Sequence, residues 1–223
     1  MSELTSHGLP QRRFYITNWQ IYLGILMINI LVACLFKKFI MTKDIYYNLL
    51  SEQIESYRID QYVELMNRYS IWGFITIPIT LFIKVLFISL LLQLPLLTKF
   101  VEISFTRIFR IVLLASISLC AGLVAQFVYI YSMPISEITT NILIKYPLSL
   151  AQLVDIQKYN DSSNIVFNSI NVFEILWIFL IYKGLANTKR IKKIDSAILI
   201  LSVWTVLLVL RWAVISYLYR MYS

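Results

Sequence analysis

The sequence predicts an all-α fold, a polytopic membrane helix bundle with about five transmembrane helices and an amphipathic helix between the first and the second. The 223 residues are 59% hydrophobic and 14% charged, with a mean hydropathy of +0.74, whereas soluble domains are about half apolar and about a quarter charged. Five apolar runs approach the ~20 residues that a helix needs to cross ~30 Å of hydrocarbon. Because the bilayer core offers no water to backbone groups, each run is expected to be helical.

The predicted segments fill the chain and leave no room for a separate soluble catalytic domain. In order they are a polar tail (1–16), the first membrane helix (17–36), the amphipathic connecting helix (37–70), the second membrane helix (71–98), the third (108–131), a loop with a short helix (132–165), the fourth membrane helix (166–182), a basic loop (183–195) and the fifth membrane helix (196–218). Function is therefore expected within the membrane or at its surface.

The first apolar run, 17–36, is predicted to be a retained membrane anchor. Arg12 and Arg13 supply a basic flank before it, as in a signal peptide. The run is longer than the apolar core of a signal peptide, and Lys37 and Lys38 follow it without a small-residue cleavage site.

The segment 37–70 is predicted to be an amphipathic connecting helix. Apolar side chains recur in it near helical spacing, with charged residues between them, at Ile45, Leu49, Ile54, Tyr62 and Met66. This pattern is typical of a helix that lies along a membrane or packs against a bundle. Both arrangements are open from the sequence.

The second and third apolar runs differ in their side chains. The second, 71–98, is long and is interrupted by Pro78 and Pro95. The third, 108–131, is rich in small residues, and Ser118 and Gly122 form a small-xxx-small pair that lets helix backbones approach closely. The third run is therefore predicted to be a central helix of the bundle.

The long connection 132–165 is predicted to be a loop with one short helix around residues 148–158. Pro134, Pro147 and the polar tract 160–164 are typical of loops. Asn160 also opens a formal glycosylation sequon, a short motif that often occurs by chance.

The fourth and fifth runs, 166–182 and 196–218, enclose a basic loop. Five basic residues crowd it, Lys183 and a cluster of four: Lys189, Arg190, Lys192 and Lys193. Because cytoplasmic loops carry an excess of Lys and Arg, we expect this loop and the N-terminus to be cytoplasmic and the C-terminus to be outside, in a bacterial inner membrane. Lys37 and Lys38, on the other face, argue against this orientation. The cluster also suits a topology anchor or a contact with anionic lipid headgroups.

Three ionisable side chains lie inside predicted membrane helices: Lys84, Glu174 and Arg211. A charge at the bilayer centre is unfavourable by about 2.5–3.5 kcal/mol, so each should face protein, water or a partner. Counted from the outer ends of their helices, Glu174 and Arg211 lie at similar depths, ~12 Å and ~10 Å, which predicts an ion pair. Lys84 is expected to be a second or competing partner. The pair either fixes helix register or belongs to a proton or ion path.

Two amides extend this polar set. Asn171 precedes Glu174 at helical spacing, and Gln126 lies in the third apolar run. Amide side chains commonly tie membrane helices together by hydrogen bonds of about 0.6 kcal/mol. A structural role is therefore the first expectation for both.

Several classes of site are excluded by residue type. The one histidine, His7, lies in the polar tail, and Cys34 and Cys120 lie inside apolar runs. Neither a metal site nor a disulfide framework is expected from them. The net charge of +8 comes without a base-reading motif, so no nucleic-acid partner is expected.

Enzyme activity is not expected either. Glu174 is the single carboxylate within the apolar runs, which excludes a protease that needs two. A dyad of Ser89 and Lys84 would point its two side chains about 140° apart on one helix. We therefore expect neither a catalytic residue nor a cofactor.

Three stretches form a recognisable order of apolar runs and polar steps. They are ITIPITLFIKVLFISLLLQLP (75–95), ISFTRIFRIVLLAS (103–116) and INVFEILWIFLIYKGLAN (170–187), in which an Asn-x-Phe-x-x-x-Trp helix ends in Lys-Gly-Leu. Over roughly residues 70–218 this order resembles bacterial membrane proteins of the Yip1-like type, five-helix proteins with a cytoplasmic N-terminus. The resemblance implies a non-enzymatic scaffold or accessory factor that binds proteins or shapes membrane. The inserted 37–70 helix departs from the eukaryotic members.

Two functions are open from the sequence. The first is a non-enzymatic integral membrane scaffold or accessory subunit that contacts membrane lipid and either a membrane protein partner or a second copy. The alternative is a small transport or permease subunit in which Lys84, Glu174 and Arg211 form an intramembrane polar path. Because polar residues on any one helix face are few and widely spaced, the scaffold is the first expectation.

Overall fold

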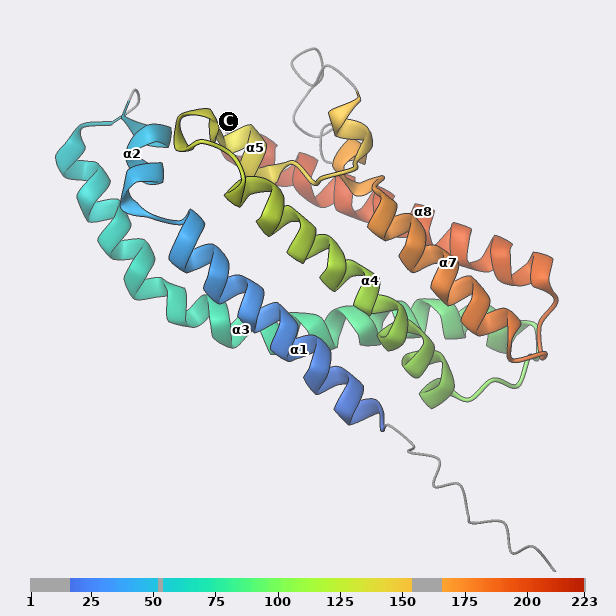
Figure 1. Ribbon diagram of the computed structural model, residues 1–223. Coiled ribbons are helices and arrows are strands. Elements are labelled where there is room, and N and C mark those ends of the chain that lie inside the picture. The colour runs from blue at the N-terminus through green and yellow to red at the C-terminus, as the bar shows by residue number, and fades with distance from the viewer. Residues whose placement is uncertain (1–16, 52–53, 154–165, 223) are drawn as a thin grey trace, which may run out of the picture.

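The computed structural model describes residues 17–51, 54–153 and 166–222, and every regular element in these ranges is helical (Figure 1). The elements are α1 (Asn18–Leu35), a π-helical turn (Phe36–Ile40), α2 (Lys43–Leu50), α3 (Ser56–Thr98), α4 (Phe105–Tyr131), α5 (Thr140–Ile144), α7 (Val172–Ala186), α8 (Lys193–Tyr222) and two 3-10 turns (Ile135–Glu137 and Leu150–Gln152). The predicted tail 1–16 and the sequon at Asn160 lie outside the described residues.

Four helices of the described chain are long and apolar enough to cross a membrane. They are Asn18–Ile40, Ser56–Thr98, Phe105–Tyr131 and Lys193–Leu218. The all-helical class is confirmed, and these four helices support a multi-pass membrane protein. The fifth predicted crossing corresponds to α7, which has 15 residues. At 1.5 Å per residue it extends only ~22 Å, which is less than the ~30 Å of a hydrocarbon core.

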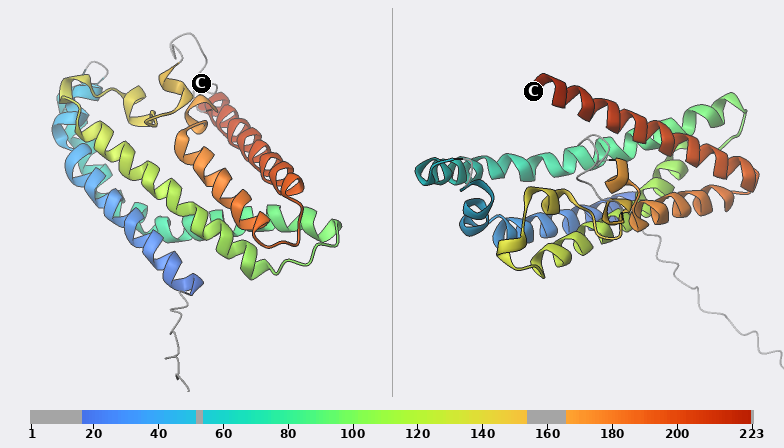
Figure 2. Two further views of the ribbon diagram at one scale, coloured as in Figure 1. Left: turned by 45° about the vertical axis from the view of Figure 1, so that its right-hand side comes forward. Right: turned by 90° about the horizontal axis from the view of Figure 1, so that it is seen from above.

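The helices are arranged in two layers (Figure 2). In the first layer α1, α4 and α7 lie side by side with α4 in the middle. α3 crosses the other face of this layer, and α8 packs against α7 and α3. Four small residues of α4 are buried in the bundle: Ala115, Ser116, Ser118 and Gly122. The prediction of a central third helix agrees with this packing.

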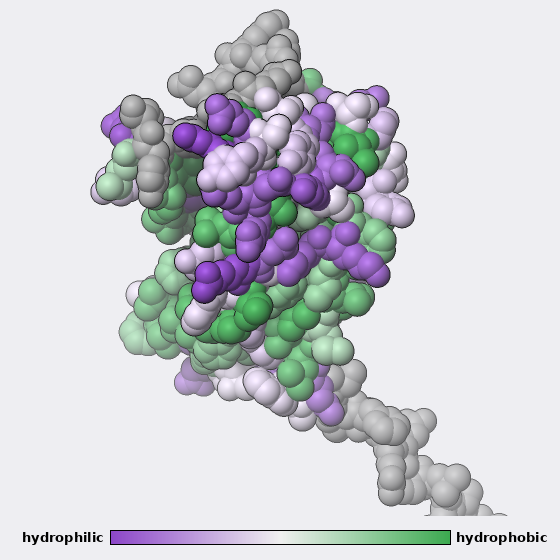
Figure 3. Space-filling view, turned by 90° about the vertical axis from the view of Figure 1, so that its left-hand side faces the viewer, coloured by the Kyte–Doolittle hydropathy of each residue, from purple (hydrophilic) through white to green (hydrophobic). Residues whose placement is uncertain are grey.

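The connection between α1 and α3 differs from the predicted single helix over 37–70. The chain forms the π-helical turn and α2, and α3 then begins at Ser56 and continues unbroken to Thr98. Half of the predicted connecting helix is thus joined to the second membrane helix, because no Gly or Pro interrupts residues 56–72. A helix of 43 residues extends ~65 Å, about twice the thickness of a hydrocarbon core. On this side of the molecule a hydrophilic band lies beside a hydrophobic region (Figure 3).

α2 packs against the bundle. Ile45 of α2 is buried in a small cluster with Ile40, Ile130 and Ile138. At its N-terminal end the ammonium of Lys43 lies 2.7 Å from Asp60 Oδ1 of α3. The hydrogen bond and the charge of Asp60 raise the pKa of Lys43. Lys43 therefore stabilises the folded protein through this pair at every pH below the ordinary pKa of lysine. This contribution is lost as the pH rises through the raised pKa of Lys43.

α3 contains Pro78 and Pro95 and bends along its length (Figure 1). A proline inside a helix removes one backbone hydrogen bond and is a common cause of such bends. The hydroxyl of Tyr22 on α1 donates a 2.7 Å hydrogen bond to the carbonyl oxygen of Pro78. This bond fastens α1 to the middle of α3.

Candidate functional site

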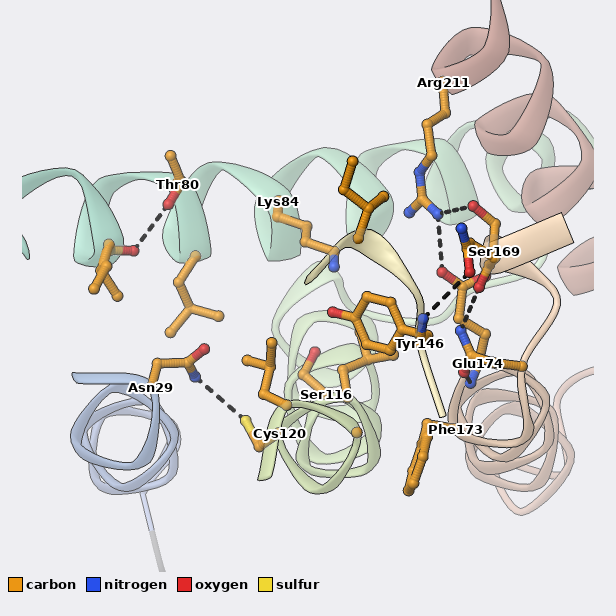
Figure 4. Close-up of a pocket in the computed structure, with 18 residues that line it drawn as sticks. Asn29, Thr80, Lys84, Ser116, Cys120, Tyr146, Ser169, Phe173, Glu174 and Arg211 are labelled. Atoms are coloured by element: carbon orange, nitrogen blue, oxygen red, sulfur yellow. Dashed lines mark hydrogen bonds and ion pairs between the residues drawn. The ribbon is translucent and has the colours of Figure 1, made fainter. Parts of the chain in front are cut away.

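A cavity of about 470 Å³ lies between α3 and the layer of α1, α4 and α7 (Figure 4). Its polar lining comes from five helices, from the segment that follows α5 and from residues 168–171 before α7: Asn29, Thr80, Lys84, Ser116, Cys120, Tyr146, Asn168, Ser169, Asn171, Glu174 and Arg211. All three ionisable residues singled out from the sequence line this one cavity. Each helix contributes only a few polar groups, but their convergence makes a polar site.

The late start of α7 creates the space for the cavity. Phe173, in the first turn of α7, packs against Gly122 of α4, where an added Cβ would lie 3.1 Å from its ring. α4 continues from Gly122 to Tyr131, roughly 14 Å further. α7 therefore begins well inside the end of the bundle. The segment before it folds back and pairs with residues 148–150, with Leu150 N donating to Ile170 O at 3.0 Å.

Asn171 is the N-cap of α7. Its side-chain oxygen accepts a 2.9 Å hydrogen bond from the backbone N–H of Glu174, and its backbone is extended. The predicted helix 166–182 therefore begins six residues too early, and Asn171 does not share a helix face with Glu174 as expected. Asn is a favoured cap because its side chain satisfies a free N–H of the first turn. The Asn-x-x-Glu spacing resembles a helix-start signal that could have located this end.

Glu174 and Arg211 form the predicted ion pair. Arg211 Nη1 lies 3.0 Å from Glu174 Oε1 and also donates to the hydroxyl of Ser169. The second carboxylate oxygen of Glu174 accepts a 3.3 Å hydrogen bond from Trp204 Nε1. The Glu174 side chain is 15% exposed and that of Arg211 is 41% exposed, so the carboxylate is the more deeply held partner.

Lys84 points from α3 into the cavity (Figure 4). It was expected to compete for Glu174, but its ammonium makes no hydrogen bond or ion pair with the part of the chain that the structure describes. Since the charges of Glu174 and Arg211 offset each other, Lys84 leaves the described lining with one excess positive charge.

Tyr146 reaches the cavity from the segment that follows α5 (Figure 4). Burial and then the charge of Glu174 raise the pKa of its hydroxyl. The hydroxyl therefore stays protonated at neutral pH and can donate a hydrogen bond into the cavity. Tyr146, Ser116, Cys120 and Asn29 are site residues that sequence reasoning missed, because nothing in the spacing of residues from separate segments relates them.

The other predicted residues lie away from this cavity. Gln126 donates a 3.1 Å hydrogen bond from Nε2 to the carbonyl oxygen of Leu143 and so ties α5 to α4. The basic cluster is exposed at the turn between α7 and α8, at the far end of α7 from the cavity, and its members are Lys189, Arg190, Lys192 and Lys193. Within residues 17–51, 54–153 and 166–222, no three His, Cys, Asp or Glu side chains gather to hold a metal ion.

The fold and the cavity define the class of this protein: a helical chain whose described residues include four helices long and apolar enough to cross a membrane, with a polar cavity inside the bundle. Comparison of the chain with protein-family models, with curated proteins and with solved structures gives no match. Arguments about function therefore rest on the residues of the site itself.

Proposed function

We propose that this chain is a multi-pass membrane protein of the transport or permease type whose helix bundle binds an anionic group beside Lys84. The observation that carries the proposal is the ammonium of Lys84, which projects into a polar cavity and has no anionic partner in the described chain. A charge in a membrane helix is stable only beside protein, water or a counter-ion. Glu174 is already engaged by Arg211, so the counter-ion comes from a ligand.

The neighbouring groups suit an oxyanion. The hydroxyl of Tyr146 is a donor without a partner in the described ranges, and Lys84 supplies three N–H donors. Charge-assisted hydrogen bonds to carboxylate or phosphate oxygens are about twice as strong as neutral ones. A small carboxylate or phosphate group is therefore the favoured ligand. We propose no chemical reaction, cofactor or nucleic-acid partner for this site.

We further propose that α7 makes a fifth crossing, with the N-terminus cytoplasmic and the C-terminus outside in a bacterial inner membrane. α7 packs beside α4 and α8, and the folded segment before it completes the outer part of its path. A reporter that works only in the cytoplasm is expected to be silent when fused after Ser223 and active when fused before Met1. The reverse result would reverse the orientation.

The charge of the cavity can be measured through Cys120, which lines it. Cys34, the other cysteine, is exposed and is replaced in a Cys34→Ser protein. Cys120 is expected to react faster with an anionic methanethiosulfonate reagent than with a cationic one of similar size. Lys84→Gln should lower the anion-to-cation rate ratio about a hundredfold, because one nearby charge changes the two rates in opposite directions by about 1.4 kcal/mol, or tenfold, each.

Lys37→Gln is the matched control, because it removes a lysine that does not line this cavity. It should leave the rate ratio within about twofold. A cation preference at Cys120, or a ratio that Lys84→Gln does not change, would contradict the proposal.

A second candidate function is the accessory subunit that the Yip1-like resemblance implies. It is favoured by the N-terminal part of α3, which packs against α2 and exposes large apolar side chains: Tyr57, Tyr62, Leu65, Met66, Tyr69, Ile71 and Trp72. Mild-detergent purification from native membranes tests it. One membrane protein recovered in equal amount, and lost when Tyr69 and Trp72 are replaced by serine, would support this function.

A further inference from the structure

We infer that the ligand is an amphiphile, with an anionic head beside Lys84 and an apolar tail held between α1 and α3. This inference rests on the proposed function and names its ligand class. A second cavity, of about 560 Å³, lies among α1, α3 and α4. Its volume falls within the range of about 300–1,000 Å³ that is typical of small-molecule sites.

The two cavities adjoin each other. Asn29, Ile77 and Leu123 line both of them. These three residues come from α1, α3 and α4, the helices that enclose the second cavity. A ligand held beside Lys84 therefore has a continuous wall of protein leading toward the π-helical turn and α2.

The second cavity is suited to an apolar chain. Its walls include Val32, Phe36, Met66 and Phe74, and thioether and aromatic side chains adapt well to flexible apolar groups. Two of its polar members, Lys37 and Gln126, already have partners. Lys37 Nζ donates to Ser70 Oγ and Gln126 donates to a backbone carbonyl, so neither side chain needs a ligand there.

The charges fix the direction of the ligand. Lys37 contacts Ser70 and lies over the ring of Phe74, with 6.0 Å between its Nζ and the ring centroid. Lys84 makes neither a hydrogen bond nor a cation–π contact with the described residues. The head group is therefore assigned to the Lys84 end and the tail to the Lys37 end.

The test uses the full chain with Cys34→Ser in phosphatidylcholine nanodiscs. Straight-chain carboxylates from acetate to decanoate are titrated, and the rate at which N-ethylmaleimide labels Cys120 is measured. We expect half-protection at concentrations that fall about three- to fourfold for each added methylene. Decanol and decyltrimethylammonium, which lack the negative charge, should not protect. Binding of radiolabelled decanoate to the same discs gives a second readout that does not depend on the reactivity of Cys120.

Two pairs of variants separate the head from the tail. Ala33→Phe fills the second cavity, whereas Leu31→Phe adds the same ring to an exposed face of α1. Only Ala33→Phe should remove the dependence of protection on chain length. The longer carboxylates also partition more strongly into the bilayer, but this partitioning is the same for both variants and therefore cancels when they are compared. Lys84→Gln should abolish protection by every carboxylate, and Lys38→Gln, which removes an exposed lysine that lines neither cavity, should change it by less than about twofold.

The possible results distinguish the two proposals. Equal protection by acetate and decanoate, or chain-length dependence that survives Ala33→Phe, overturns the amphiphile and keeps the anion site. Absence of both carboxylate protection and decanoate binding overturns the anion site itself.

The lipid composition of the nanodiscs shows whether the ligand is a bilayer lipid or a free amphiphile. Protection in discs that contain phosphatidylglycerol, without any added carboxylate, identifies a bilayer lipid as the source. Protection that requires added decanoate identifies a free amphiphile. Either result supports the assigned ligand class.

Discussion

Replacing Gly184 with alanine is expected to destabilise the bundle by about 1–3 kcal/mol, the usual range for overpacking a well-packed interface. An added Cβ would lie 2.5 Å from Ile111 Cγ2 and 3.1 Å from its Cγ1, where α7 meets α4. Ile111 cannot turn away easily, because a β-branched side chain in a helix has one strongly preferred rotamer. The two helices must therefore move apart. Thermal unfolding of the purified protein in mild detergent measures the loss.

Gly24 provides the matched control in α1. An added Cβ there meets no atom within 4 Å, so Gly24→Ala should be neutral or stabilising by up to about 1 kcal/mol, the helix propensity of alanine over glycine. Ile111→Ala should also recover much of the stability lost by Gly184→Ala, because the two residues touch. Equal effects of Gly184→Ala and Gly24→Ala would show that α4 and α7 do not depend on this close approach.

The helices that consist of one long apolar run could be predicted from the sequence. The runs 17–36, 108–131 and 196–218 correspond closely to α1, α4 and α8, because a bilayer demands long, continuous apolar helices. The long α3 was not predictable by the same reasoning. Its change from charged to apolar residues near 70 looks like a boundary, but a helix continues through a change of polarity when neither proline nor glycine stops it.

The start of α7 could not be located from the apolar content of the sequence. The apolar window 166–182 placed the helix too early, since the polar backbone contacts of residues 168–171 are invisible to a hydropathy count. The ion pair was nevertheless predictable. Glu174 and Arg211 lie near the same end of adjacent helices, and the long Arg211 side chain tolerates an error of several residues in the start of α7.

The cavity itself could not be predicted from the sequence. Its lining residues are spread from Asn29 to Arg211 and share no periodic pattern. The space exists because α7 begins far inside the end of α4, which is a difference between two helix ends. The scarcity of polar residues on each single helix, which favoured a scaffold, therefore says little about a site where five helices converge.

Replacing Glu174 with alanine is expected to destabilise the protein by about 2 kcal/mol. Breaking a fully buried pair costs about 3–5 kcal/mol, and the partial exposure of Arg211, 41%, reduces this because water can solvate the guanidinium. Glu174→Gln should cost less, since the amide oxygen can still accept the hydrogen bond of Arg211, although its NH2 group cannot accept that of Trp204. A double-mutant cycle with Arg211→Ala should give a coupling of about 1–2 kcal/mol. Additive single effects would show that the pair contributes no coupling energy.

Glu174→Gln also tests whether the charge of Glu174 contributes to the electrostatic potential of the cavity. Glu174→Gln removes the negative charge that offsets Arg211 and so makes the cavity more positive. The anion-to-cation rate ratio at Cys120 is therefore expected to rise about a hundredfold, opposite in direction to the effect of Lys84→Gln. A ratio that Glu174→Gln leaves unchanged would show that the charge of Glu174 does not affect the potential at Cys120, whatever the pair contributes to the unfolding free energy.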